Sequence, residues 1–180
     1  MSIKPTYMTN TVKALESILW IVERRANFDI YHVVKAAFFA DKHHVATYGR
    51  PICGDVYSAG HYGPLPMVMY GLLKRDPLEL IALDSNGELP FSQGPRFTVV
   101  PSRGPNLRKL SKSDVEALTI GVSHVESLSF DAIYNETHAD PAYLNAGGGR
   151  MDYRDFIPDS DPLKSKKAEF IEETAQYAVL

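Results

Sequence analysis

Apolar residues recur at helical spacing along most of the chain, so the pattern predicts a mainly helical protein. Between residues 10 and 25 the apolar side chains fall on one helix face, and the polar residues 9–11 can cap its start. A second helix is predicted over residues 29–46, with Asp29 as its N-cap and Gly49 just beyond its end. A third helix is predicted over residues 66–75, because a proline is well suited to a first helical turn.

Helix-start signals continue in the second half of the chain. Ser111 and Asp114 form a capping box that opens a fourth helix. Ser129 predicts the start of a fifth helix that runs to about His138, and Asp140 followed by proline predicts a short sixth helix.

Short apolar runs between these helices predict strands. Residues 56–59 indicate one strand, followed by a rigid turn over the glycine- and proline-rich residues 60–66. Residues 80–83 and 96–100 indicate two more strands, joined through an Asn-Gly pair at residues 86–87. The predicted fold class is therefore α+β, a mainly helical single domain with a small antiparallel β-sheet.

The last part of the chain differs from the rest. Residues 1–157 are predicted to form one domain, in which three glycines at residues 147–149 supply a flexible joint. Residues 158–180 are predicted to be a linker followed by a C-terminal helix over residues 163–179. This helix either packs on the domain or reaches a partner.

Composition narrows the functional classes. The chain has 180 residues, 44% of them apolar, with a net charge of −3 and a pI near 6.1. This balance argues against a nucleic-acid-binding surface, which would be basic. The one cysteine, Cys53, is expected to be a buried or idle thiol. No apolar run is long enough to cross a bilayer and the first residues lack a signal peptide, so we expect a cytoplasmic protein.

Polar residues that could perform chemistry gather in two regions, residues 39–64 and 137–141. Their spacing matches no metal-binding, nucleotide-binding or nucleophile motif, so we predict no metal, no cofactor and no enzyme. The alternative that stays open is a hydrolase or metalloenzyme that uses Asp41, His61 and His138.

A structural interpretation accounts better for these regions. Arg50 can tie the loop around it by bridging Asp55 or Asp41, and Asp41 can pair with His44 one helical turn away. A stiff loop rich in tyrosine also suits a protein-binding surface. The candidate partner-binding or loop-shaping residues are Asp41, His44, Tyr48, Arg50, Asp55, His61, Tyr62, His138 and Asp140.

Three segments in this order carry a resemblance to a known family. They are KAAFFADKHH at residues 35–44, YGRPICGD at 48–55 and HYGPLP at 61–66. Together they resemble the Panacea domain, the SocA-like antitoxin family, and weaker similarity extends over about residues 10–157. The chain departs from the family pattern at Ala37-Phe38, at Cys53 and at Tyr143, where Leu-Tyr, Thr and Trp are usual.

The resemblance implies a role in a toxin–antitoxin system, often carried by a phage or plasmid. The expected partner is a cognate toxin encoded next to this gene and neutralised by direct protein contact. An adaptor that delivers its bound partner to a protease is the alternative reading of the same resemblance.

Overall fold

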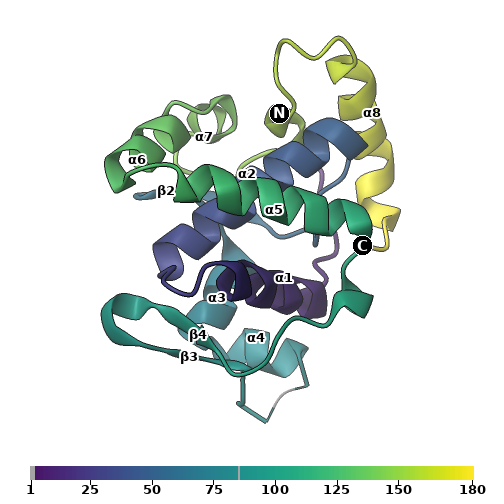
Figure 1. Cartoon of the computed structure of the whole chain (residues 1–180). Helices are drawn as coiled ribbons and strands as arrows, with labels where there is room; N and C mark the ends of the chain where they lie inside the picture. The colour runs from purple at the N-terminus through teal and green to yellow at the C-terminus, as the bar shows by residue number, and fades with distance from the viewer. Residues whose placement is uncertain (1–2, 85) are drawn as a thin grey trace.

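Eight α-helices and two small antiparallel sheets make up the fold in the computed structural model, which describes residues 3–84 and 86–180 (Figure 1). The first helices are α1 (Thr11–Arg24) and α2 (Ile30–Tyr48), and α5 (Lys112–Glu126) lies across α2. This arrangement confirms the predicted α+β class. None of the helices in the described part of the chain has the length and apolarity to cross a bilayer.

The predicted helix starts are confirmed by their caps. Asp29 Oδ1 accepts the His32 N–H at 2.9 Å at the start of α2, and α2 ends at Gly49 in the left-handed conformation. Ser111 and Asp114 form the predicted capping box of α5. Ser129 caps α6 (Phe130–His138), and Asp140 caps α7 (Pro141–Ala146). Local sequence signals thus set where these helices begin.

Helices α2 and α5 pack with their backbones close together. A methyl group placed on Gly121 of α5 would lie 2.2 Å from the Ala36 carbonyl oxygen and 3.0 Å from the Ala40 side chain of α2. Only a residue without a side chain fits there. Glycine and alanine therefore allow α2 to lie deep in the molecule, between α1 and α5.

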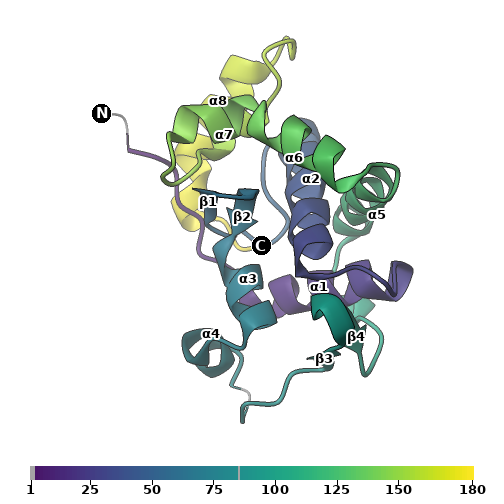
Figure 2. The ribbon, with the colours of Figure 1, turned by 90° about the vertical axis from the view of Figure 1, so that its left-hand side faces the viewer.

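The segment after α2 forms a hairpin. Strand β1 (Tyr57–Gly60) pairs antiparallel with β2 (Gly63–Pro66), with Gly60 opposite Gly63. The prediction of a rigid turn over residues 60–66 was wrong in part, because only residues 61–62 form the turn and the rest is strand. In Figure 2 the hairpin lies between α3 (Met67–Lys74) on one side and α6 and α7 on the other.

Helix α3 packs on the core through one face. Met69, Leu72 and Leu73 are buried, whereas Met67 in its first turn is 43% exposed.

The region after α3 also differs from the prediction. Residues 80–83 do not form a strand, because Asp76 caps the helix α4 (Pro77–Ala82) and Pro77 occupies its first turn. The second sheet instead pairs β3 (Phe91–Gln93) with β4 (Val99–Pro101). The Asn-Gly pair at residues 86–87 lies in the connection between α4 and β3 and does not join two strands. Residues 1–2 and 85 lie outside the described residues.

The core has two parts. The larger one joins α1, α2, α3 and α5, and the smaller one surrounds Phe38, Tyr57 and Phe156. Phe156 lies in a 3₁₀ turn (Tyr153–Phe156) that follows α7. The aromatic rings of Phe38, Tyr57 and Phe156 meet edge to face at 5.3–5.9 Å.

The glycines at residues 147–149 do not form the flexible joint that we predicted. The Ala59 N–H donates to the Gly149 carbonyl, and the Met151 N–H donates to the Tyr57 carbonyl, each at 2.9 Å. The segment is therefore bonded to the outer edge of β1.

The C-terminal helix α8 (Lys164–Thr174) packs on the rest of the chain. Its Ile171 is fully buried in the smaller core, and the Leu180 carbonyl accepts a hydrogen bond of 2.6 Å from Asn10 Nδ2. Tyr177, which lies in the 3₁₀ turn after this helix, is exposed. The division of the chain at residues 157 and 158 stays a prediction.

We expect Gly121→Ala to lower the free energy of unfolding by about 1–3 kcal/mol, because the new methyl group forces α2 and α5 apart. Ser123→Ala, at an exposed position of the same helix, should change it by less than about 0.5 kcal/mol. Urea unfolding of the two variants measures the difference. Equal stabilities would contradict the close packing of the two helices.

Candidate functional site

Seven of the nine candidate residues fall into two groups. Asp41, His44, Arg50 and Asp55 surround the loop between α2 and β1, and the first, second and fourth of these are buried. His61, Tyr62 and His138 lie at the tip of the hairpin and on the neighbouring helix α6. Tyr48 and Asp140 belong to neither group: the Tyr48 hydroxyl donates to Glu116 at 3.3 Å, and Asp140 pairs with Lys42.

Asp41 joins helix α2 to the loop. Its carboxylate accepts the Ile52 N–H at 2.7 Å and the Tyr57 hydroxyl at 2.9 Å. Burial raises the pKa of Asp41, and these two hydrogen bonds oppose the shift. Both partners belong to the loop and to β1, so the carboxylate holds the start of the hairpin against α2.

Asp55 caps helix α3, although it lies well before this helix in the chain. Its two carboxylate oxygens accept the N–H groups of Val68 and Met69, each at 2.9 Å, in the first turn of α3. Pro66, which precedes this helix, offers no side-chain cap. Burial raises the pKa of Asp55 to about 7, although both N–H groups favour the carboxylate.

Asp114, which was not among the candidate residues, is the centre of a separate cluster of buried polar side chains. Lys13 Nζ lies 2.8 Å from its carboxylate, and His44 Nε2 lies at 3.3 Å. Burial alone would raise the pKa of Asp114, but the hydrogen bonds from His44, Lys13 and the Ser111 N–H hold it well below its usual range. The side chain thus joins α1, α2 and the start of α5.

The predicted pairings of Arg50 and of His44 were wrong, because both side chains lie close to Asp114 instead. Arg50 does not bridge Asp55 or Asp41, since its guanidinium lies 3.9 Å from Asp114 and donates to the Pro51 carbonyl at 3.2 Å. His44 does not pair with Asp41. Its Nδ1 donates to the Arg50 carbonyl at 2.7 Å, and its Nε2 meets the Ser113 hydroxyl at 3.1 Å and lies 3.3 Å from Asp114.

Cys53 is buried in the larger core, as expected. Burial raises the pKa of its thiol well above the usual value, with Asp41 and Asp55 adding to the shift. A thiol in this setting stays protonated and is a poor nucleophile.

The residues of the metalloenzyme alternative do not assemble. Asp41 bonds to the loop, whereas His138 Nδ1 bonds to the Tyr134 carbonyl at 2.7 Å and its Nε2 meets the His61 backbone carbonyl at 3.1 Å. The His61 ring packs on Tyr62 instead. Within residues 3–84 and 86–180 no three His, Cys, Asp or Glu side chains are placed to hold a metal ion.

Aromatic rings form a continuous row beside the hairpin. Phe130, Tyr134 and His138 lie four residues apart on one face of α6, with ring centroids 6.3 and 3.8 Å apart. Tyr31 of α2 extends the row at one end, 4.6 Å from Phe130, and Tyr143 extends it at the other, 4.6 Å from His138. The Tyr143 hydroxyl donates to the Gly60 carbonyl at 2.9 Å. We call these five residues the aromatic row.

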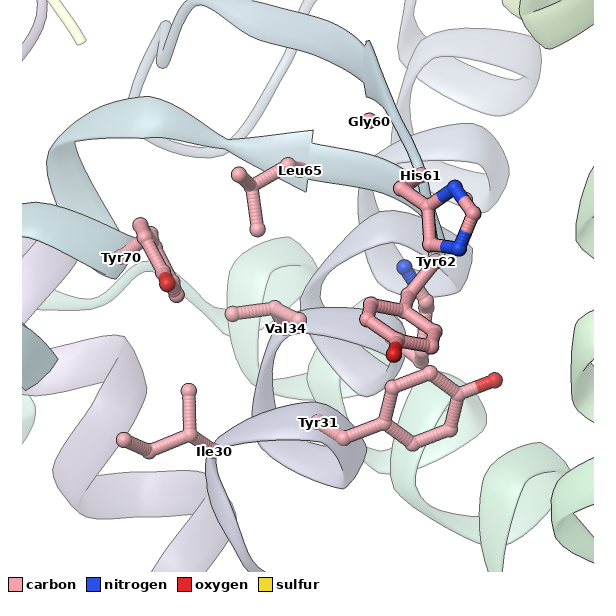
Figure 3. Close-up of a pocket in the computed structure, with 10 residues that line it drawn as sticks. Ile30, Tyr31, Val34, Gly60, His61, Tyr62, Leu65 and Tyr70 are labelled. Atoms are coloured by element: carbon pink, nitrogen blue, oxygen red, sulfur yellow. The ribbon is translucent and has the colours of Figure 1, made fainter.

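A pocket of about 190 Å³ opens between α2 and the hairpin (Figure 3). Tyr31 and Tyr62 lie on one side of it, and Ile30, Val34, Leu65 and Tyr70 surround the other. Lys35, His61, Gly60 and Gly63 complete the lining. We call this the Lys35 pocket.

Lys35 is the unusual residue of this pocket, because only 1% of it is exposed. Its Nζ donates to the Pro64 carbonyl at 2.7 Å and lies 5.2 Å from the centre of the Tyr31 ring. A methyl group on Gly63 would lie 3.1 Å from this nitrogen, so the glycine is needed for its approach. Burial lowers the pKa of Lys35 to about 7.

The comparisons with known proteins bear on the segment that carries both groups. Residues 33–143 match the family described as "Antitoxin SocA-like, Panacea domain", from the first turn of α2 into α7. The chain belongs to this family. No curated protein and no solved structure matches it.

The matched segment therefore contains every residue of both groups, whereas α1 and α8 lie outside it. Its family is one of antitoxins, which suggests a role other than catalysis. The three segments that carried the resemblance form α2, the loop after it and the hairpin.

Sequence reasoning missed Lys35, Asp114 and Tyr31 as important residues. Lys35 did carry a signal, since a lysine between Val34 and Ala36 falls within an apolar helical segment. Asp114 was noted only as part of a capping box. Its contacts with Lys13 and His44 join segments far apart in the chain, and no local pattern indicates them.

The free energy of unfolding of this Panacea domain should rise between pH 7 and pH 9, relative to that of Lys35→Met. The folded protein releases the Lys35 proton near pH 7, whereas the unfolded chain keeps it to about pH 10.5, so the unfolded state binds more protons in this interval. The slope should approach about 1.4 kcal/mol per pH unit.

Tyr31 beside Lys35 has its pKa raised to about 12 by burial and stays neutral in this interval. Urea unfolding of both proteins at several pH values measures the difference. If the difference in free energy of unfolding between wild type and Lys35→Met stays constant with pH, Lys35 is not a buried lysine without an acidic partner.

Proposed function

We propose that the chain is the antitoxin of a toxin–antitoxin pair and that it neutralises a cognate toxin by binding it directly. The observation that carries the proposal is the family match over residues 33–143. In this proposal both proteins act in the cytoplasm, and their genes lie side by side on phage or plasmid DNA.

The surface around the hairpin supports direct binding and is the face that we assign to the toxin. Tyrosine is among the residues that contribute most to protein interfaces, because its ring buries a large area at a small entropic cost. We define the binding face as the aromatic row together with the Lys35 pocket and the hairpin tip. Besides the other residues that line the pocket, its members are Tyr31, Lys35, His61, Tyr62, Phe130, Tyr134, His138 and Tyr143.

The buried polar groups support this face from behind. Asp41 and Lys35 both bond to the loop and hairpin from α2, and Tyr143 bonds to the hairpin from α7. A surface held in this way loses little entropy when a partner binds. A standard interface needs about 800 Å² per partner.

Co-expression tests the proposal. We expect the neighbouring gene product to stop growth when it is expressed alone and this chain to restore growth to at least the level of uninduced cells. The two proteins should then co-purify as a complex. A harmless neighbour, or a toxic one that this chain neither rescues nor binds, would contradict the proposal.

The same cells distinguish direct neutralisation from delivery to a protease. An immunoblot should show the toxin at undiminished level in rescued cells, because a bound toxin is masked and not removed. Loss of the toxin only when a cellular protease is present would support the adaptor function instead.

A further inference from the structure

The Lys35 pocket has the size of a single side chain. Its volume of about 190 Å³ is below the roughly 300 Å³ at which small-molecule and cofactor pockets begin, whereas an apolar cavity of about 150 Å³ holds one benzene ring. One side chain, and not an extended ligand, therefore fits between α2 and the hairpin.

The walls and the end of the pocket differ in chemistry. Ile30, Val34, Leu65 and the rings of Tyr31, Tyr62 and Tyr70 provide apolar contacts. Lys35 also lines the pocket, and its ammonium nitrogen, the one cationic group of the lining that is always a hydrogen-bond donor when charged, lies 5.2 Å from the centre of the Tyr31 ring.

The amine of Lys35 lacks an acidic partner. An ammonium group has three donors, and the only hydrogen bond that Lys35 makes among the described residues goes to the Pro64 carbonyl. No carboxylate in residues 3–84 or 86–180 forms an ion pair with it. A buried amine of this kind is stabilised by an incoming anion, because charge-assisted hydrogen bonds are strong where water is excluded.

Tyr31, whose ring lines the pocket, carries a second polar group without a partner in the described part of the chain, although its hydroxyl points away from the apolar lining (Figure 3). The Tyr31 hydroxyl is buried and has no hydrogen-bond partner among the described residues. Tyr31 belongs to both the Lys35 pocket and the aromatic row, so the two parts of the binding face meet at a residue with unused hydrogen-bonding capacity.

We propose that the Lys35 pocket receives one acidic side chain of the toxin, with its aliphatic part between Val34, Leu65 and Tyr62 and its carboxylate on Lys35. This inference rests on the proposed function and specifies the chemistry of its partner. The charge of Lys35 selects the acidic group, and the volume of the pocket limits the insertion to one side chain.

Titration of the purified toxin with variants of the full chain tests the inference. Lys35→Met keeps the apolar stem and removes the charge, and we expect it to raise the Kd at least tenfold, as loss of one partner of a buried charge pair does. Tyr62→Ala, at a rim residue that is 59% exposed, should raise the Kd to a similar degree without affecting the lysine. Leu78→Ala, at an exposed position of α4, should leave the Kd within twofold.

Variants of the toxin identify the inserted group. Each of its acidic residues is changed to the matching amide, and one such change should weaken binding to the wild-type chain tenfold but have no further effect on binding to Lys35→Met. Melting temperatures of all variants establish that they are folded, and Tyr62→Ala decides the question if Lys35→Met does not fold.

Three results would overturn the inference. The first is a folded Lys35→Met and a folded Tyr62→Ala that both bind within twofold of wild type, which leaves the proposed function intact but places the toxin elsewhere. The second is sodium benzoate that occupies the pocket, detected by NMR, while the toxin stays bound, which would assign the pocket to small carboxylates. The third is a toxin that does not bind the wild-type chain at all, and this result alone would also refute the proposed function.

Discussion

Three buried polar side chains of helix α2 hold the loop and the hairpin that follow this helix. Lys35, Asp41 and His44 each bond to a different segment of the following chain, namely the hairpin, the loop and the turn that leaves the helix. A buried polar group without a partner costs about 1–3 kcal/mol, so these bonds favour one common arrangement of the loop and hairpin. Helix α2 can lie deep enough to make them because Gly121 allows α5 to approach it closely.

In this arrangement the buried polar side chains support the surface, and a different set of side chains forms it. The carboxylates of Asp41, Asp55 and Asp114 all point into the protein, where they bond to backbone N–H groups, a hydroxyl or cationic side chains. The surface beside them is made of aromatic rings and one small pocket. Such a division suits a binding protein, because the buried bonds fix the shape of the face while its exposed side chains contact the partner. It also accounts for the polar motif without requiring catalysis.

The sequence predicted the helices well because their starts depend on local signals, such as Asp29 and the capping box at Ser111. Residues 80–83 were assigned to a strand because a run of four apolar residues fits a strand and a short helix equally. The structure shows that Asp76 caps a helix here. For the site, the resemblance indicated the right segments, but the pairings of Arg50 and His44 depend on Asp114, which lies far away in the chain. Contacts between residues so far apart in the chain are set by the packing of the helices, and the spacing of residues in the sequence does not indicate them.

In the proposed function the toxin contacts the face formed by α2, the hairpin and α6. Hydrogen–deuterium exchange of the chain, alone and in complex with its toxin, tests this contact. We expect slower exchange in residues 30–35, 59–65 and 130–143 in the complex, with α4 and α8 unchanged. Protection confined to α4 or α8, with the hairpin and α6 exchanging as in the free chain, would contradict it.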